Sequence, residues 1–140
     1  MEGVTPSGTF SWPIRVYYED TDSGGVVYYA NYLRFLERAR AEWLRSFGFE
    51  QTDLLHEQGV IFVVRAITVD YLKPALFNDL LGVTVELEEI RKGQIALAQS
   101  VRRGQVLLAD ARVRLACVGS TSFKPVKIPA AIIEKLGMYL

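Results

Sequence analysis

The first regular pattern along the chain is a two-residue alternation of apolar and polar side chains. It runs from Phe10 to Tyr18, where Ile14 and Val16 alternate with Arg15. This period places successive side chains on opposite faces of an extended segment and therefore predicts a β-strand. Pro13 has no backbone N–H to donate, which favours a position at the edge of a sheet.

The spacing then changes to the three-to-four-residue period of a helix. Between Asn31 and Phe47, the apolar positions that would share one helix face are Tyr32, Phe35, Leu36, Ala39 and Trp43. Gly48 follows them and predicts the end of this long helix. A shorter helix is expected at Thr52–Gln58.

Strand patterns return after Gly59 and continue almost to the C-terminus. The expected strands lie at 61–71, around 83–88, and at about 110–117, with turns at Lys92-Gly93 and Arg103-Gly104. In the last of them, the residues predicted to face inward are Ala111, Val113, Leu115 and Cys117, and those predicted to face outward are Asp110, Arg112 and Arg114. A short helix is expected at Ala130–Leu136.

This order of elements predicts an α+β fold in which one long central helix packs on an antiparallel sheet of about five strands. The whole chain, residues 1–140, is expected to form a single domain, with residues 1–9 loosely held. One helix covers only one face of a sheet. The other face, or a sheet edge, is therefore expected to meet a partner subunit.

Composition narrows the classes of protein that the chain can represent. Its formal net charge is +0 over 140 residues, which argues against a general binder of nucleic acid or membrane surfaces, because both need a basic excess. The N-terminus lacks the pattern of a signal peptide, and charges interrupt the most apolar later segment, so no membrane span is expected. Cys117 is the single cysteine, which excludes an internal disulfide and fits a reducing cytoplasm.

The stretch YYEDTDSGGVVYYANY, residues 17–32, crowds the acids Glu19, Asp20 and Asp22 beside two glycines and a run of aromatic side chains. A carboxylate can act as general base or nucleophile. Unpaired N–H groups at the start of the next helix would stabilise the oxygen anion that forms on an attacked carbonyl. The combination favours acyl transfer, although spacing alone does not choose among the three acids. The same residues also fit an acidic turn that caps the helix.

A thioester suits such a site, because a thiolate whose thiol has a pKa near about 8.5 leaves without a proton donor. The single histidine, His56, lies in the predicted short helix without a second ligand nearby. Neither a metal site nor a catalytic histidine pair is therefore predicted, and no metal or redox cofactor is expected.

The segment VYYEDTDSGGVVYYANYLRFLERARAEWLR, residues 16–45, resembles the motif of the hotdog-fold acyl-CoA thioesterases. Within the 4-hydroxybenzoyl-CoA thioesterase superfamily, the resemblance is closest to the Tol-Pal-associated YbgC type. It continues through FVVRAITVDYLKPALFNDLL and FKPVKIP, and so covers nearly the whole chain in register. It implies a hotdog fold, in which an antiparallel sheet wraps a central helix, and a homodimer or a homotetramer made from two dimers.

The resemblance also implies site residues. The catalytic second acid of the family's D-x-D pair corresponds to Asp22, and the oxyanion-binding donor corresponds to the backbone N–H of Tyr29. The residues implied to shape the turn and contact the substrate are Gly25, Val26, Val27 and Tyr28, with Tyr32 as a candidate for the acyl pocket. Family active sites lie at the dimer interface, so Asp22 would work beside residues of a second subunit.

One position departs from the YbgC pattern, which has a histidine where this chain has Tyr29. The backbone N–H survives that exchange. The exchange does remove the imidazole, a group that titrates near neutrality, because a phenol has a reference pKa of about 10. The 4-hydroxybenzoyl-CoA enzymes resemble this chain in having a tyrosine there, which keeps aromatic acyl groups among the candidate substrates.

Three basic residues outside the acidic motif are candidates for a specific role. Arg91 and Lys92 occupy a predicted strand turn, where charge often serves only solubility; the resemblance implies that they contact the nucleotide phosphates of coenzyme A. Arg65 interrupts an apolar strand and needs a partner if it is buried; a carboxylate within the fold or a phosphate of the ligand would serve, and the carboxylate is favoured.

With the resemblance, the sequence predicts hydrolysis of a short-chain or aromatic acyl-CoA to the free acid and coenzyme A. Whether Asp22 attacks the carbonyl or activates water stays open. One alternative is a protein that binds acyl-CoA or acyl carrier protein near the cell-envelope machinery with little turnover, which makes acyl carrier protein a candidate partner. The other is a hotdog hydratase or dehydratase, which needs a histidine with an acid; His56 is remote in sequence from the acidic motif.

Overall fold

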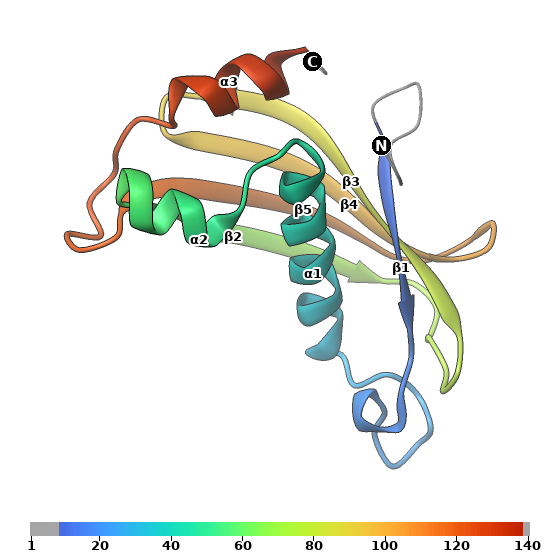
Figure 1. The fold of residues 1–140 in the computed structure, drawn as a ribbon. Coiled ribbons are helices and arrows are strands. Elements are labelled where there is room, and N and C mark those ends of the chain that lie inside the picture. The colour runs from blue at the N-terminus through green and yellow to red at the C-terminus, as the bar shows by residue number, and fades with distance from the viewer. Residues whose placement is uncertain (1–8, 139–140) are drawn as a thin grey trace.

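The frame of the protein is a five-stranded antiparallel sheet, described for residues 9–138 in a computed structural model (Figure 1). In spatial order the strands are β1 (Phe10–Arg15), β3 (Leu80–Arg91), β4 (Gln94–Arg103), β5 (Val106–Gly119) and β2 (Val60–Tyr71). The predicted α+β class is confirmed, and β1 and β2 are the two edges of the sheet. The expectation of looseness at residues 1–9 lies outside the described residues except at Thr9.

The first strand is shorter than the predicted Phe10–Tyr18. It ends at Arg15, and Tyr18–Asp20 form a turn of 3₁₀-helix, η1. The reason is local, because the Asp20 carboxylate accepts a hydrogen bond from the Tyr17 N–H at 2.8 Å and bends the chain out of the sheet. Tyr18 is consequently exposed instead of alternating inward.

The long helix α1 (Asn31–Ser46) lies across one face of the sheet (Figure 1). The five residues predicted for its apolar face are all buried: Tyr32, Phe35, Leu36, Ala39 and Trp43. This face packs mainly on β1, β3 and β4. Gly48 follows the helix with a φ of 91°, a left-handed conformation that glycine adopts without strain and that ends the helix.

Three further helical segments complete the fold. α2 (Gln51–Asp53) continues into the π-helical turn η2 (Leu54–Gln58), and together they occupy the predicted short helix. α3 (Ala130–Gly137) matches the predicted C-terminal helix and packs against β3, with Ile132 and Leu136 buried. No helix within residues 9–138 combines the length and the apolar composition needed to cross a membrane.

The alternation predicted for β5 is confirmed, since Ala111, Val113, Leu115 and Cys117 all point into the core. Burial raises the pKa of the Cys117 thiol, so this side chain stays protonated and packs as an apolar group. Irregular register between residues 64 and 66 of β2 and between residues 87 and 89 of β3 marks β-bulges. Bulges increase local twist and bend, and they help the sheet curve around α1.

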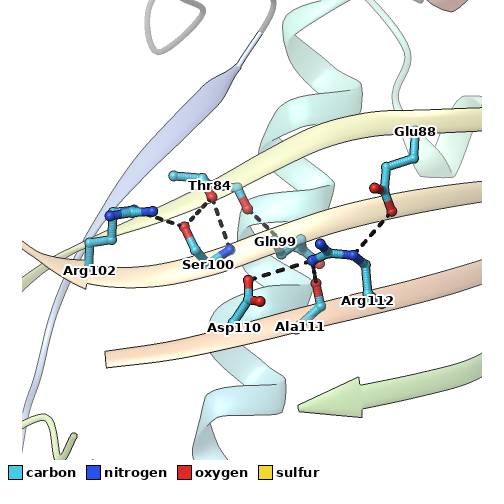
Figure 2. A network of polar contacts seen from close by, with 8 residues as sticks. All are labelled: Thr84, Glu88, Gln99, Ser100, Arg102, Asp110, Ala111 and Arg112. Atoms are coloured by element: carbon cyan, nitrogen blue, oxygen red, sulfur yellow. Dashed lines mark hydrogen bonds and ion pairs between the residues drawn. The ribbon is translucent and has the colours of Figure 1, made fainter. Parts of the chain in front are cut away.

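The opposite face of the sheet carries a network of polar side chains (Figure 2). The hydroxyls of Thr84 and Ser100 lie 2.6 Å apart, and the Arg102 guanidinium donates to Ser100 at 3.2 Å. Arg112 forms ion pairs with Glu88 at 3.4 Å and with Asp110 at 3.6 Å. The outward orientation predicted for Asp110 and Arg112 is thus confirmed.

The two hairpin glycines offer a matched test of how closely the β3–β4 turn is packed. Gly93 and Gly104 have φ values of 70° and 60°. A Cβ on Gly93 would lie 2.9 Å from the Val126 carbonyl oxygen, whereas no described residue lies within 4 Å of a Cβ on Gly104. We expect Gly104→Ala to lower the free energy of unfolding by about 1 kcal/mol through left-handed strain alone. Gly93→Ala should cost clearly more, because the segment at Val126 must move; equal losses in urea unfolding would contradict this packing.

Candidate active site

The acidic stretch forms a loop between β1 and α1, and its two ends are held by the segment that precedes β3. At the first end, the Val16 N–H donates to the Asp79 carbonyl and the Asn78 N–H donates to the Val16 carbonyl, both at 2.9 Å. At the other end, the Val27 N–H donates to the Ala75 carbonyl at 2.9 Å. These backbone bonds attach the two ends of the loop to the segment that leads into the sheet.

Of the three acids, Asp20 is the one that holds the loop together. The residue is 5% exposed, and its carboxylate accepts hydrogen bonds from the Tyr17 N–H at 2.8 Å and from the Asn31 side-chain amide at 3.0 Å. Its backbone carbonyl accepts from the Tyr28 N–H at 2.9 Å. Asp20 therefore ties the end of β1 to the start of α1, and both of its carboxylate oxygens are occupied.

Asp22, in contrast, presents an exposed carboxylate on a tight turn. Its N–H donates to the Val26 carbonyl at 2.9 Å, and its carbonyl accepts from the Gly25 N–H at 3.1 Å. Gly25 has a φ of 80°, which explains the glycine at this position. Within the described chain, the only hydrogen bond to the Asp22 carboxylate comes from the Gly24 N–H at 2.8 Å, which leaves most of its acceptor capacity free.

The helix that follows begins with unpaired donors. Asn31 N–H donates to the Tyr28 carbonyl at 2.8 Å and Tyr32 N–H to the Tyr29 carbonyl at 3.3 Å. The N–H groups of Tyr29 and Ala30 find no acceptor among residues 9–138, and no side chain caps this helix end. Two donors thus remain free at the positive end of the helix dipole.

A group of tyrosines surrounds this helix end. The Tyr29 ring lies 4.9 Å from that of Tyr28 and 6.3 Å from that of Tyr71, and the Tyr71 hydroxyl donates to the Tyr29 carbonyl at 3.1 Å. Tyr32 is buried, and its hydroxyl accepts from the Ala75 N–H at 3.0 Å. A hydrogen bond with the Tyr29 side chain raises the pKa of Tyr28.

These tyrosines border a small depression of about 240 Å³. Its lining includes Val27, Tyr29, Tyr32 and Tyr71. The structure therefore places Val27, Tyr29 and Tyr32 around one depression, while Asp22 is linked to Val26 through the backbone of the turn. Tyr71 was missed by sequence reasoning, because nothing in the spacing of β2 indicates that its end returns to the start of α1.

The other predicted contact residues lie at the far end of β3. Arg91 is exposed and forms an ion pair with Glu89. Lys92 lines an open depression of about 590 Å³ together with Arg65 and Lys127. The carboxylate partner expected for Arg65 was wrong within the described chain: this side chain is exposed at the β2 bulge and pairs with no acid. These three cations come from separate segments of the chain, so that only the folded structure shows that they lie together.

His56 does not join the acidic loop. It is exposed on η2, beyond the C-terminal end of α1, whereas Asp22 precedes the N-terminal end. The 16 residues of α1 alone span about 24 Å. A histidine and acid pair of the kind that a hydratase needs is therefore not assembled within this described chain.

Chemically, the loop combines an available carboxylate with two free N–H donors beside an aromatic depression. A carboxylate can attack a carbonyl or activate water for the attack, and oriented N–H groups stabilise the negative charge that develops on the carbonyl oxygen. The depression at Lys92 adds three cations suited to an anionic group. The arrangement fits hydrolysis of an activated acyl compound that carries a remote negative charge.

Comparison with known proteins points to the hydrolysis of acyl thioesters. The chain matches the family model of the thioesterase-like superfamily over residues 16–136. It is 47% identical over 123 residues to the acyl-CoA thioesterase YbgC of Haemophilus influenzae, covering 88% of this chain and 90% of that protein. It is 44% identical over 127 residues to the acyl-CoA thioester hydrolase YbgC of Escherichia coli O157:H7, covering 90% and 94%.

Among solved structures, a probable thioesterase from Bartonella henselae superposes with a TM-score of 0.83 at 34% identity. The superposition covers 86% of this chain and 99% of that protein. The predicted hotdog fold is thereby confirmed, as is the resemblance to the YbgC type. From its matched length, its identity to these relatives and its fold, the chain belongs to the thioesterase-like superfamily.

Proposed function

We propose that this protein hydrolyses an acyl-CoA thioester to the free acid and coenzyme A. The observation that carries the proposal is the pair of free N–H groups at Tyr29 and Ala30, connected through a short hydrogen-bonded ladder to the turn that presents Asp22. The names of the relatives, acyl-CoA thioesterase and acyl-CoA thioester hydrolase, support the same reaction.

Asp22 is the acid best suited to act on the thioester. Asp20 has both carboxylate oxygens committed to the loop, whereas the Asp22 carboxylate is exposed and holds a single hydrogen bond. It would attack the carbonyl carbon and form a mixed anhydride that water then hydrolyses, or it would deprotonate a water that attacks the carbonyl directly; in both cases coenzyme A would leave as the thiolate. Short-chain or aromatic acyl groups fit the small depression bordered by Tyr29, Tyr32 and Tyr71.

The carbonyl oxygen would be held by the backbone N–H of Tyr29, aided by the helix dipole. One such donor is typically worth about 3 kcal/mol in the barrier. Gly25, Val26, Val27 and Tyr28 serve this geometry by forming the turn and the ladder that leads into the helix. Because the donor is a backbone group, a tyrosine at position 29 preserves it.

Coenzyme A would be recognised through its phosphates by Lys92 with Arg65 and Lys127, and by Arg91 once it leaves Glu89. The cationic depression lies at the end of β3, and the Asp22 loop is held next to the beginning of β3. Twelve strand residues span roughly 40 Å. A thioester at Asp22 would therefore reach the cations of a second subunit more readily than those of its own.

Such a second subunit would dock along β2, which is an edge strand with no partner on its outer side in the described sheet. Val63 and Val64 are 36% and 47% exposed there. Antiparallel pairing of two copies of β2 over their full length would place the Tyr71 end of one strand beside the Val60 end of the other, in whose half Val63, Val64 and Arg65 lie. We therefore propose a homodimer that completes two sites, from which a tetramer can form.

Replacing Asp22 with asparagine tests the catalytic acid. Asparagine can keep the hydrogen bond from Gly24 but cannot act as base or nucleophile, so kcat should fall by roughly 100-fold or more with unfolding unchanged. Glu19→Gln, a neighbouring exposed acid, is the matched control and should retain activity. The measurement is thiol release from a panel of short, long and aromatic acyl-CoA esters; equal rates for Asp22→Asn and wild type would refute the assignment.

The cationic depression can be tested by separating nucleotide recognition from chemistry. Lys92→Ala and Lys127→Ala should each raise KM for acyl-CoA several-fold, leave kcat nearly unchanged and weaken the salt dependence of binding. Hydrolysis of acyl-pantetheine, which lacks the nucleotide phosphates, should be the same in both variants and in wild type. An equal effect on the two substrate types would show that these lysines act on the fold instead of on coenzyme A.

The proposed interface predicts the mass of the particle in solution. Sedimentation of the wild type should give at least twice the 15.8 kDa chain mass. Val64→Lys should shift it towards the monomer and reduce thioesterase activity, because a charge at an edge strand opposes pairing. Ile133→Lys, which changes a similarly exposed apolar residue on α3, should leave the mass unchanged. A monomeric and fully active wild type would exclude the interface.

A further inference from the structure

The hydroxyl of Tyr71 forms a hydrogen bond between two distant elements, the end of β2 and the start of α1. Tyr71 is the last residue of β2, and its hydroxyl donates to the Tyr29 carbonyl at 3.1 Å. Its ring also lies 5.2 Å from the ring of Tyr32 and 6.3 Å from that of Tyr29. One hydrogen bond and two ring contacts therefore hold the end of this strand against the first turn of the helix.

The carbonyl that accepts this bond belongs to the same peptide unit as a free donor. A planar peptide joins the carbonyl of one residue to the N–H of the next, so the Tyr29 carbonyl and the Ala30 N–H move as one rigid group. The Ala30 N–H has no acceptor among residues 9–138. The Tyr71 hydroxyl thus fixes one end of this peptide while the other end is available to a ligand.

The helix alone holds this peptide weakly. The other bond to the Tyr29 carbonyl comes from the Tyr32 N–H at 3.3 Å, which is longer than the usual distance of about 2.9–3.0 Å. No side chain caps this end of α1, and uncapped helix ends fray. The bond from Tyr71 is the shorter of the two and starts from the sheet. It therefore supplies support that the helix end lacks.

The same bond strengthens the Ala30 donor. Consecutive hydrogen bonds polarise one another, so donation to the carbonyl of a peptide increases the positive charge on its N–H. The Tyr28 and Tyr29 carbonyls already accept bonds from residues three positions later, and Ala30 has a helical φ of -68°. The N–H groups of Tyr29 and Ala30 therefore point out of the same end of the helix, where one oxygen atom can meet both.

We propose that Tyr71 is a positioning residue of the active site, whose hydroxyl orients and polarises the peptide between Tyr29 and Ala30 so that the Ala30 N–H becomes a second donor to the thioester carbonyl oxygen. This inference rests on the proposed thioester hydrolysis and adds to it a residue that the acidic motif does not contain. Negative charge builds on that oxygen when the nucleophile adds to the carbonyl carbon, and it returns to the carbon–oxygen bond when the thiolate leaves. The second donor stabilises the charge in between.

Tyr71→Phe tests the hydroxyl while keeping the ring that packs on Tyr29 and Tyr32. Loss of an oxyanion donor costs about 100-fold or more in kcat; here the donor remains and loses its support, so kcat for acyl-CoA should fall roughly tenfold with KM unchanged. The matched control is Tyr18→Phe, which removes the hydroxyl of an exposed ring stacked on Phe77. It should keep both wild-type constants.

A vibrational measurement separates this role from a purely structural one. The probe is an acyl-CoA analogue in which a methylene replaces the sulfur and the carbonyl carries ¹³C, so that it binds without being hydrolysed. Two donors should lower its carbonyl stretching frequency relative to water, and Tyr71→Phe should lose part of that shift. Asp22→Asn and Tyr18→Phe should retain the full shift. The frequency is a property of each bound analogue and does not depend on the folded fraction.

An unchanged carbonyl frequency in Tyr71→Phe would overturn the inference whatever the kinetics, and so would a wild type that binds the analogue without any shift. Neither result would touch the proposed hydrolysis, which is judged by thiol release from the wild type and Asp22→Asn. Conversely, a wild type that releases no thiol would refute the proposed hydrolysis, and the frequencies would still decide whether Tyr71 acts on the Ala30 donor.

Discussion

The buried carboxylate of Asp20 is the constraint on which the candidate active site depends. Hydrogen bonds to a charged group contribute about 1.5–3 kcal/mol each, and this carboxylate accepts one from the backbone of Tyr17 and one from the side chain of Asn31. The first bends the chain away from β1, and the second brings it to the start of α1. The position of the Asp22 turn, and hence of the exposed acid, follows from these two contacts.

The same helix organises two different chemical environments. At its beginning, the N–H groups of Tyr29 and Ala30 have no acceptor among the described residues. Further along the helix, Arg40 lines a cavity between the helix and the sheet. The helix can serve both because its apolar face packs mainly towards β1, β3 and β4, which leaves the β2 side open. An edge strand that is half covered by its own helix is well placed to contribute to a ligand site and to a subunit interface.

The sequence was sufficient for the elements whose periods are long and regular. The apolar face of α1 and the inward face of β5 were predicted residue by residue, because each repeats several times with one period. The end of β1 was not predicted correctly, because Tyr18 continues the alternation of apolar and polar residues while the Asp20 carboxylate bends the backbone. Local hydrogen bonding ends the strand there although the alternation continues, and the spacing of apolar residues does not reveal such a bond.

Spacing also could not distinguish Asp20 from Asp22. They are two residues apart, and only the fold shows that one is buried and bonded while the other is exposed. Tyr71 and Gln99 were missed, as a site residue and as a buried polar residue, for a related reason. Each meets its neighbours through the pairing of distant strands, so its surroundings are a property of the sheet order instead of any contiguous motif.

The turn from Asp22 to Val26 has a consequence for divergence within the family. It is closed by backbone groups, with only the Asp22 carboxylate and the left-handed Gly25 depending on residue type. The side chains of Ser23, Val26 and Tyr28 can therefore change without altering the bonds that place the acid. Mutation at these positions can alter which acyl groups are accepted while the reacting geometry is inherited intact, so that new substrate preferences can arise in small steps through active intermediates.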